Sequence, residues 1–157
     1  MANAKINMPV EGRSVWLVGD LITVKVSSEQ TGGAFAVAEE RTPPQGGPPA
    51  HLHANEDETL YVLEGEVEFL VGDQIIRAGA GSSAYVPRGV LHTFKNVGET
   101  PSRMLAVVSP GGLDGFFLEA GEEATEGSSP PEGEPDVGRI MEIGRRYGVE
   151  FPPPPGR

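Results

Sequence analysis

The chain has 157 residues and a formal net charge of −11, and it contains no cysteine. Its length fits one compact domain, and the lack of cysteine excludes disulfides, thiolate metal ligands and cysteine nucleophiles. The acidic charge, without a local cluster of Lys or Arg, makes nucleic acid and anionic membranes unfavourable partners. Residues 1–16 contain no apolar signal segment, and no apolar run approaches the ~20 residues that span a bilayer, so we expect a cytoplasmic protein.

Short segments rich in β-branched and aromatic residues follow one another over residues 14–109, separated by turns that contain glycine and proline. We expect strands over Val15–Val18, Leu21–Ser27, Ala34–Arg41, Leu60–Leu63, Glu66–Val71, Gln74–Arg77, Ser83–Val86, His92–Asn96 and Arg103–Ser109. The pairs Glu64-Gly65 and Gly72-Asp73 are typical of tight hairpins. Many short strands without alternating helices indicate an all-β sandwich or barrel.

The pattern changes after residue 110. Leu113–Ala120 carries apolar residues at helical spacing and predicts a short helix. The acidic stretch Gly121–Pro135, rich in Gly, Ser and Pro, predicts a mobile loop. Asp136 is placed to cap a second helix, which Gly148 would end. The C-terminal part therefore adds one or two helices to a β-rich body.

The three histidines of the chain are His51, His53 and His92. In a strand, residues two apart point to the same face, so His51 and His53 would lie side by side. Glu58 begins an apolar run, where its carboxylate would face the same interior from a neighbouring strand. Imidazole nitrogen and carboxylate oxygen suit Fe, Mn, Co, Ni, Cu or Zn. Taken singly, each of these residues is more typical of a half-exposed strand or a solvated acidic turn.

Two longer motifs favour the metal-binding interpretation. The sequence HLHANEDETLYVLEG, from His51 to Gly65, resembles the first motif of the cupin family, H-x-H-x(3–4)-E-x6-G. The sequence GSSAYVPRGVLHTFKN, from Gly81 to Asn96, resembles the second motif, G-x5-P-x-G-x2-H-x3-N, at every fixed position. The two motifs occur in the right order and together include all three histidines.

The resemblance implies that His51, His53, Glu58 and His92 hold one divalent transition metal ion per chain, either Fe, Mn, Ni, Co, Cu or Zn. Two roles for Glu58 are compatible with it: a metal ligand, or a catalytic base that takes a proton from the substrate. The first motif usually opens with a glycine at the position of Gln45 in this chain. Since glycines follow directly, we expect the turn to be shifted by one residue.

The resemblance, whose motifs cover about half of the chain, roughly Thr42–Ser109, also implies a cupin jelly-roll, a double-stranded β-helix barrel, with one or two short C-terminal helices. On this basis residues 1–157 form a single domain, with the barrel core at about 14–110 and a helical and loop extension over 111–157. The C-terminal part is loosely similar to that of small quercetinase-like monocupins. Cupins of this size commonly pair through their sheets, so we expect a homodimer in which the segment Val15–Ser27 adds to a partner's sheet edge.

Because alternate residues of a strand face the same side, the sequence predicts which apolar residues surround the histidines. Those that would line a substrate pocket, or else form ordinary barrel core, are Leu60, Val62, Phe69, Phe94 and Met104. An apolar pocket suits an aromatic or diketone-like ligand better than a sugar. Phe116 and Phe117 would either cover the mouth of the barrel as a lid or pack a helix against its wall, and the pattern favours packing.

Three classes of function follow from these residues. The first is a metal-dependent oxygenase, similar to quercetinase, acting on an enolisable aromatic or diketone-like small molecule. The second is a non-redox metal enzyme of the same fold, such as an isomerase, cyclase or decarboxylase. The third is a non-catalytic binding barrel, which the intact ligand set disfavours because a scaffold needs no metal. The ligands themselves do not separate the first two classes.

Overall fold

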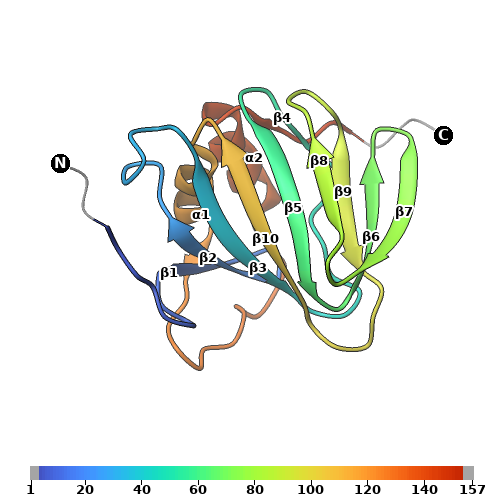
Figure 1. Cartoon of the computed structure of the whole chain (residues 1–157), viewed down its shortest axis with the longest axis horizontal. Coiled ribbons are helices and arrows are strands. Elements are labelled where there is room, and N and C mark those ends of the chain that lie inside the picture. Colours follow the sequence, from blue (N-terminus) through green and yellow to red (C-terminus); the bar gives the residue numbers. More distant parts are fainter. Residues whose placement is uncertain (1–3, 154–157) are drawn as a thin grey trace.

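The computed structural model describes residues 4–153 and shows antiparallel strands that enclose an interior, with two helices packed against one side (Figure 1). The strands of the larger sheet are β1 (Arg13–Leu17), β2 (Asp20–Val26), β3 (Ala36–Thr42), β5 (Asp57–Glu64), β8 (Ser83–Val86), β10 (Ser102–Ser109) and β11 (Glu122–Glu123). Their order is β11-β1-β2-β3-β10-β5-β8, and each neighbouring pair is antiparallel.

The other side of the barrel is built from shorter pieces. The strands β6 (Glu66–Val71), β7 (Gln74–Gly79) and β9 (His92–Asn96) pair in the order β7-β6-β9. The strand β4 (Leu52–His53) pairs with β12 (Val149–Glu150), near the C-terminus. An isolated pairing of His51 with His92 joins the β4 segment to β9. The all-β fold that the sequence predicted is thus confirmed.

The core follows from the alternation of inward and outward residues along these strands. One cluster lies between the two sheets and is formed by Leu60, Val62, Val67, Phe69, Phe94, Met104 and Ala106. A second cluster joins β1, β2 and β3 to the helices, so the interior continues beyond the sheets into the C-terminal part.

The helices α1 (Leu113–Ala120) and α2 (Val137–Arg146) confirm the two helices that the sequence predicted. Asp136 caps α2, because its side chain accepts a hydrogen bond from the backbone N–H of Arg139 at 3.0 Å. Gly148 follows the helix with a φ of 72°, a left-handed conformation that favours glycine. It turns the chain into β12.

One of the two predicted hairpins is wrong. The Gly72-Asp73 turn does join a β6–β7 hairpin, in which Val71 pairs with Gln74. Gly65, however, connects strands of different sheets, because β5 pairs with β8 and β10 whereas β6 pairs with β7 and β9. Its φ of 93° makes a corner of the barrel instead of a hairpin. A glycine turn between two apolar runs looks the same in both cases.

Two further expectations concern the edge of the larger sheet. The start of the stretch predicted as a loop, Gly121–Pro135, forms β11 and pairs with Val15 and Trp16 of β1. Further along that stretch, the Trp16 Nε1–H donates to Ser128 Oγ at 3.1 Å. Within one chain, β2 is paired on both sides, and β1 is paired with β2 on one side and only in part with β11 on the other. A strand of a partner chain would therefore have to add beside β1. Dimerisation itself stays a prediction.

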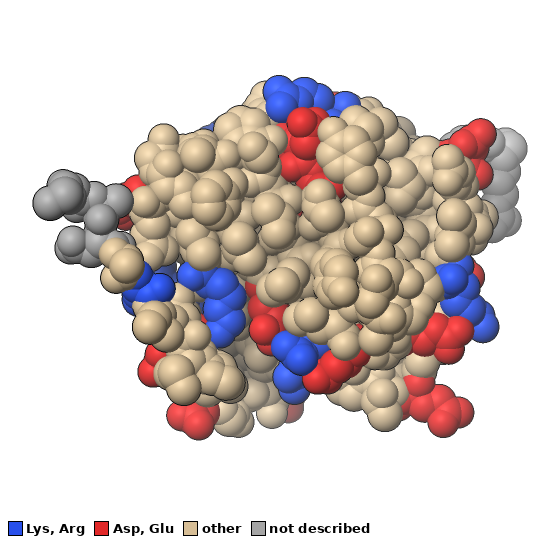
Figure 2. Space-filling model, viewed as in Figure 1, with Lys and Arg blue, Asp and Glu red and all other residues tan. Residues whose placement is uncertain are grey.

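The surface carries its charges in mixed groups. Figure 2 shows acidic and basic side chains lying beside one another at several places on one face, with a broad uncharged area between them. Ion pairs such as Arg88–Asp57 and Arg103–Glu64 account for part of this mixing. Within residues 4–153, none of the helices is long and apolar enough to cross a membrane.

The burial of Phe117 gives a test of the packing role of α1. Phe117 is 7% exposed and belongs to the second core cluster, so Phe117→Ala is expected to destabilise the fold by about 3–5 kcal/mol. Urea unfolding followed by circular dichroism measures this loss. The matched control is Phe35→Ala, at a side chain 41% exposed, which should cost less than half as much. A similar small loss for both variants would mean that α1 is a weakly attached cover.

Candidate metal centre

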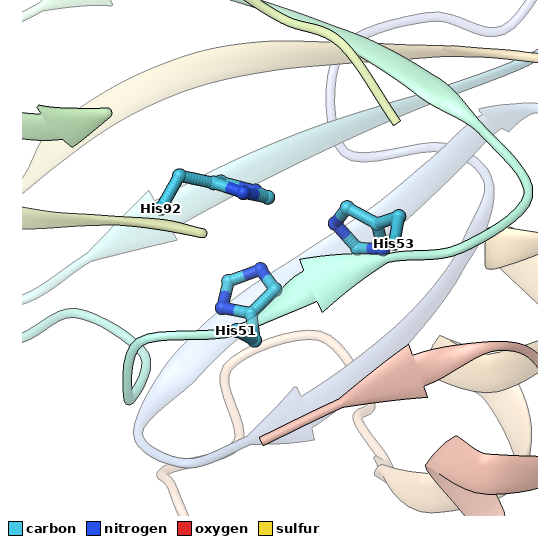
Figure 3. A group of neighbouring side chains, drawn as sticks. All are labelled: His51, His53 and His92. Carbon is cyan, nitrogen blue, oxygen red and sulfur yellow. The ribbon is translucent and has the colours of Figure 1, made fainter. Parts of the chain in front are cut away.

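The two motifs meet at one point inside the barrel. His53 lies in β4, His51 directly before it, and His92 is the first residue of β9. Each of these three histidines offers a ring nitrogen, and these nitrogens lie within 4.8 Å of one another. Figure 3 shows the three rings turned toward a common centre. The sequence therefore places three potential ligands together from segments about forty residues apart.

Backbone pairing fixes where two of these histidines stand. His51 and His92 exchange both backbone hydrogen bonds, with N···O distances of 3.0 and 2.8 Å. The preceding loop comes close to β9, since a Cβ on Gly47 would lie 2.0 Å from the Phe94 carbonyl oxygen. Gln45 itself has a φ of 66°, so the turn has not shifted as expected: glutamine adopts the left-handed conformation at the position of the usual glycine.

Hydrogen bonds to the backbone also orient the rings. The Nδ1 atoms of His51 and His92 lie 2.8 Å and 2.9 Å from the carbonyl oxygens of Pro49 and Val90. A carbonyl oxygen only accepts, so Nδ1 carries a proton in both rings and Nε2 of His51 is left with its lone pair. Nε2 of His92 lies 3.1 Å from Glu58 Oε1 and would free its lone pair on losing the proton that it shares with that carboxylate. Both imidazoles are thus held in the tautomer that a metal ligand needs.

Glu58 completes the group from the second position of β5. Its Oε1 lies 3.1 Å from His92 Nε2, and its Oε2 lies 3.8 Å from His53 Nε2. The side chains of these three residues are almost fully buried. His53 has no hydrogen-bond partner at either ring nitrogen among the described residues, which is costly for a buried polar group. A cation between the imidazoles and the carboxylate would satisfy His53 Nε2, the nitrogen that faces Glu58.

The residues present therefore fit a divalent transition metal. Three neutral imidazoles supply nitrogen ligands of intermediate softness, and one carboxylate supplies a hard oxygen ligand. Four protein ligands leave coordination positions on the metal open for water or substrate. His51, His53, Glu58 and His92 would hold the ion, as the resemblance implies. The structure supports the three histidines as a group that can bind a metal; the ligand role of Glu58 stays a prediction.

The charges of the site act on one another strongly. Burial lowers the pKa of His51 to about 4, helped by the neighbouring histidines, and burial also lowers the pKa of His53. For His92, burial would lower the pKa, but the hydrogen bond and negative charge of Glu58 outweigh it and raise the pKa. For Glu58, burial is outweighed by the same hydrogen bond and by the imidazoles, so its pKa is lowered. A proton is thus held between His92 and Glu58.

A cavity of about 60 Å³ opens beside the histidines. Of the five apolar residues expected around a pocket, Phe94 lines it, while Leu60, Val62, Phe69 and Met104 pack together in the barrel core. The remaining apolar wall comes from the β1–β2 hairpin and from the C-terminal part, namely Leu17, Val18, Ile22, Leu113, Phe116, Phe117, Ile140, Val149 and Phe151.

The sequence analysis did not anticipate most of this wall. Phe116 and Phe117 are both packed in the core and exposed to the cavity, so the two roles weighed for them coincide. Two acidic residues, Asp20 and Glu40, also line the cavity. The sequence did contain an indication of their role. Each lies close to apolar residues at an inward-facing position of a strand, where burying a carboxylate is costly.

Comparison with known proteins agrees with the fold and the motifs. Residues 38–108 match the model of the cupin domain family (Cupin_2), a range that contains both motifs and all four predicted ligands. A predicted oxalate decarboxylase from Thermotoga maritima has a crystal structure that superposes with a TM-score of 0.63, at 23% identity, covering 68% of this chain and 99% of its own. That likeness shows a shared fold. The chain thus has a cupin fold, and its residues 38–108 match the cupin domain family.

Two curated relatives are 32% identical over 60 residues, or 38% of this chain. They are the tetracenomycin polyketide synthase protein TcmJ of Streptomyces glaucescens and the polyketide synthase CurC of Streptomyces cyaneus. The matched part spans 40% and 39% of their lengths, less than half of each relative.

Metal content gives the first test of the centre. We expect about one equivalent of a divalent transition metal per chain after purification without chelator or added metal, measured by plasma mass spectrometry. Glu58→Gln and His53→Ala should each weaken metal affinity by about tenfold or more. Asp57→Asn is the matched control, since Asp57 precedes Glu58 in β5 but bonds Arg88 instead. Metal loss in all three variants would point to general unfolding.

Proton release on metal binding gives a second test, with its sign set by the pKa shifts. Near pH 6 His51 is neutral because its pKa is lowered to about 4, and the lowered pKa of His53 favours its neutral form, whereas the raised pKa of His92 keeps it protonated. The metal must therefore displace about one proton at pH 6, and the number should fall toward zero as the pH rises past the raised pKa of His92. Calorimetry in buffers of different ionisation enthalpy counts these protons. Release of two or three would contradict the shifts.

Proposed function

We propose that this protein is a metal-dependent enzyme acting on a small enolisable molecule, with an oxygenase as the first candidate. The observation that carries the proposal is the arrangement of the donors. Two oriented Nε2 atoms, the unpartnered ring of His53 and the Glu58 carboxylate converge at the side of a largely apolar cavity. A purely structural barrel gains nothing from burying such a group.

The cavity supports a small substrate. Its volume of about 60 Å³ is well below the roughly 300–1,000 Å³ of a typical pocket for drug-sized ligands. A compact 1,3-diketone or a single enolised ring comes nearest to this size. A flavonol would require the wall formed by α1, α2 and β12 to move outward, so the quercetinase-like version of the proposal depends on that movement.

The relatives support an enolisable carbonyl substrate as well. Both are polyketide synthase proteins by name, and polyketide chains carry repeated 1,3-dicarbonyl groups. The enol of such a group presents two oxygens to a metal and an apolar skeleton to the surrounding wall. This agrees with one polar side of the cavity and an apolar remainder.

The residues of the chain then have distinct tasks. A bound divalent metal would polarise the chelating oxygens of the substrate and, if redox-active, bring O₂ into reach. His51 and His92 hold their Nε2 atoms in place through the backbone carbonyls of Pro49 and Val90. The lowered pKa of Glu58 favours a ligand over a catalytic base, since a good base has a pKa near the working pH. Phe94, Phe116 and other apolar side chains exclude water.

A non-redox isomerase, cyclase or decarboxylase is the second candidate. The polyketide synthase names of the relatives favour it, because ring closure of a 1,3-dicarbonyl chain needs enolisation but no O₂. The same four donors would serve as a Lewis-acid centre in that case. A requirement for O₂ therefore separates the two candidates.

The decisive experiment loads the metal-free protein separately with Fe²⁺, Mn²⁺, Ni²⁺ and Zn²⁺ and offers 2,4-pentanedione or quercetin. An oxygen electrode and the enol absorbance follow O₂ and substrate together. We expect loss of both in equal amounts with at least one metal, abolished by His53→Ala and retained by Asp57→Asn. Substrate loss without O₂ uptake would favour the second candidate. Failure of every metal-loaded form to bind or convert either compound would overturn the proposal.

A further inference from the structure

Two carboxyl groups line the cavity away from the predicted ligand set. Asp20 is the first residue of β2, directly after the β1–β2 turn, and Glu40 lies in β3. Both are more than nine-tenths buried, at 5% and 6% exposure. They line the same cavity as the three histidines and Glu58. The cavity thus has a second polar region, supplied by the larger sheet.

Each of these carboxyl groups has an oxygen without a partner. Asp20 Oδ1 and Glu40 Oε2 make no hydrogen bond to any residue within the described range 4–153. The cavity-lining residues described by the structure include no Lys or Arg that could neutralise them. Burying these two oxygens beside Leu17, Ile22 and Phe94 without a hydrogen-bond partner costs stability. Groups kept at such a cost are characteristic of functional sites.

The charge state of the two groups narrows what they can bind. Burial raises the pKa of Asp20 to about 7, and burial together with the charges of Glu58 and Asp20 raises the pKa of Glu40 well above its usual range. Two buried carboxyl groups that line one cavity without a neighbouring cation do not ionise together readily, so one offers an O–H donor and the other an acceptor. A hydroxyl group both donates and accepts, so it matches this combination. A carbonyl only accepts and would leave the acceptor without a partner, whereas an ammonium group only donates and would leave the O–H donor without one.

We propose that Asp20 and Glu40 form a second binding subsite, which takes a hydroxyl group of the substrate while its chelating oxygens face the histidines. The inference rests on the proposed function, because it assumes a ligand held at the metal centre. It adds a selection rule to that function: the preferred substrate is a hydroxylated enol or hydroxy-ketone. A site built to hydrogen-bond a hydroxyl discriminates strongly against the analogue that lacks it.

A pair of small chelators tests this directly. Acetohydroxamate and glycolohydroxamate bind metals through the same two oxygens and differ by one hydroxyl group. Calorimetry on nickel-loaded wild-type protein should give about tenfold tighter binding of glycolohydroxamate, the size expected for one buried hydrogen bond to an acidic group. Glu40→Met and Asp20→Leu should each remove most of this preference, measured as the ratio of the two affinities in the same variant. Glu40→Gln, which can still donate and accept, should retain it.

The matched control is Glu39→Gln. Glu39 precedes Glu40 in β3 but points outward to Arg103, so its replacement should leave both affinities as in the wild type. Equal binding of the two hydroxamates by wild-type protein would overturn the subsite and leave the proposed function standing. Failure to bind either hydroxamate would overturn both. Glycine hydroxamate, which carries an amine in place of the hydroxyl, should bind no better than acetohydroxamate; tighter binding than glycolohydroxamate would overturn the hydroxyl assignment.

Thermal stability separates a binding role from a structural one. Because Glu40→Met replaces a buried, unpartnered carboxyl by an apolar chain of similar size, we expect a midpoint higher by roughly 2 °C or more. A structural role for Glu40 predicts the opposite, a lower midpoint together with weaker binding of both hydroxamates. That result would overturn the inference. If Glu40→Met does not fold, the thermal midpoint and hydroxamate binding of Asp20→Leu, together with the preference of the wild-type protein for glycolohydroxamate, decide between a binding and a structural role.

Discussion

The reciprocal pairing of His51 with His92 brings the two halves of the barrel together. It is a small interaction, an isolated bridge of two backbone hydrogen bonds, yet it joins the β4 segment to the start of β9. Because each of the two residues carries a ring whose Nδ1 is tied to the backbone, the pairing also sets the geometry of the centre. His53 follows in β4, two residues after His51, and Glu58 is placed by β5, which pairs with β8 and β10. The chemistry of the site is therefore a product of main-chain geometry.

The sequence predicted the parts of the fold that local patterns encode. Alternating apolar residues located most strands, and helical spacing located α1 with the bounds that the structure gives it. Strand parity predicted that His51 and His53 lie side by side, and the resemblance to the two cupin motifs implied that His92 joins them. What local patterns do not contain is the partner of each strand. For this reason Gly65 looked like a hairpin turn, although it joins two different sheets.

The same limit explains the cavity. The alternation of inward and outward residues along β5 correctly placed Leu60 and Val62 inside the barrel. The interior contains both a packed core and a cavity, however, and which of the two a residue faces depends on how the strands close in three dimensions. Asp20 and Glu40 were passed over because no motif includes them. Their position becomes informative once burial and missing partners are known, since only then does the energetic cost of each carboxylate become visible.

The ladder between β12 and β4 means that the C-terminal extension is not an appendage. Val149 pairs with His53, and the backbone N–H of Ala54 donates to the Gly148 carbonyl oxygen at 2.8 Å. The strand that carries a histidine of the centre is therefore an inner strand only because the far end of the chain lies beside it. Cutting the chain before β12 would turn β4 into an open edge, able to pair with other molecules. A chain trimmed to the family-matched residues 38–108 would thus replace a covered histidine cluster by a sheet edge prone to aggregation.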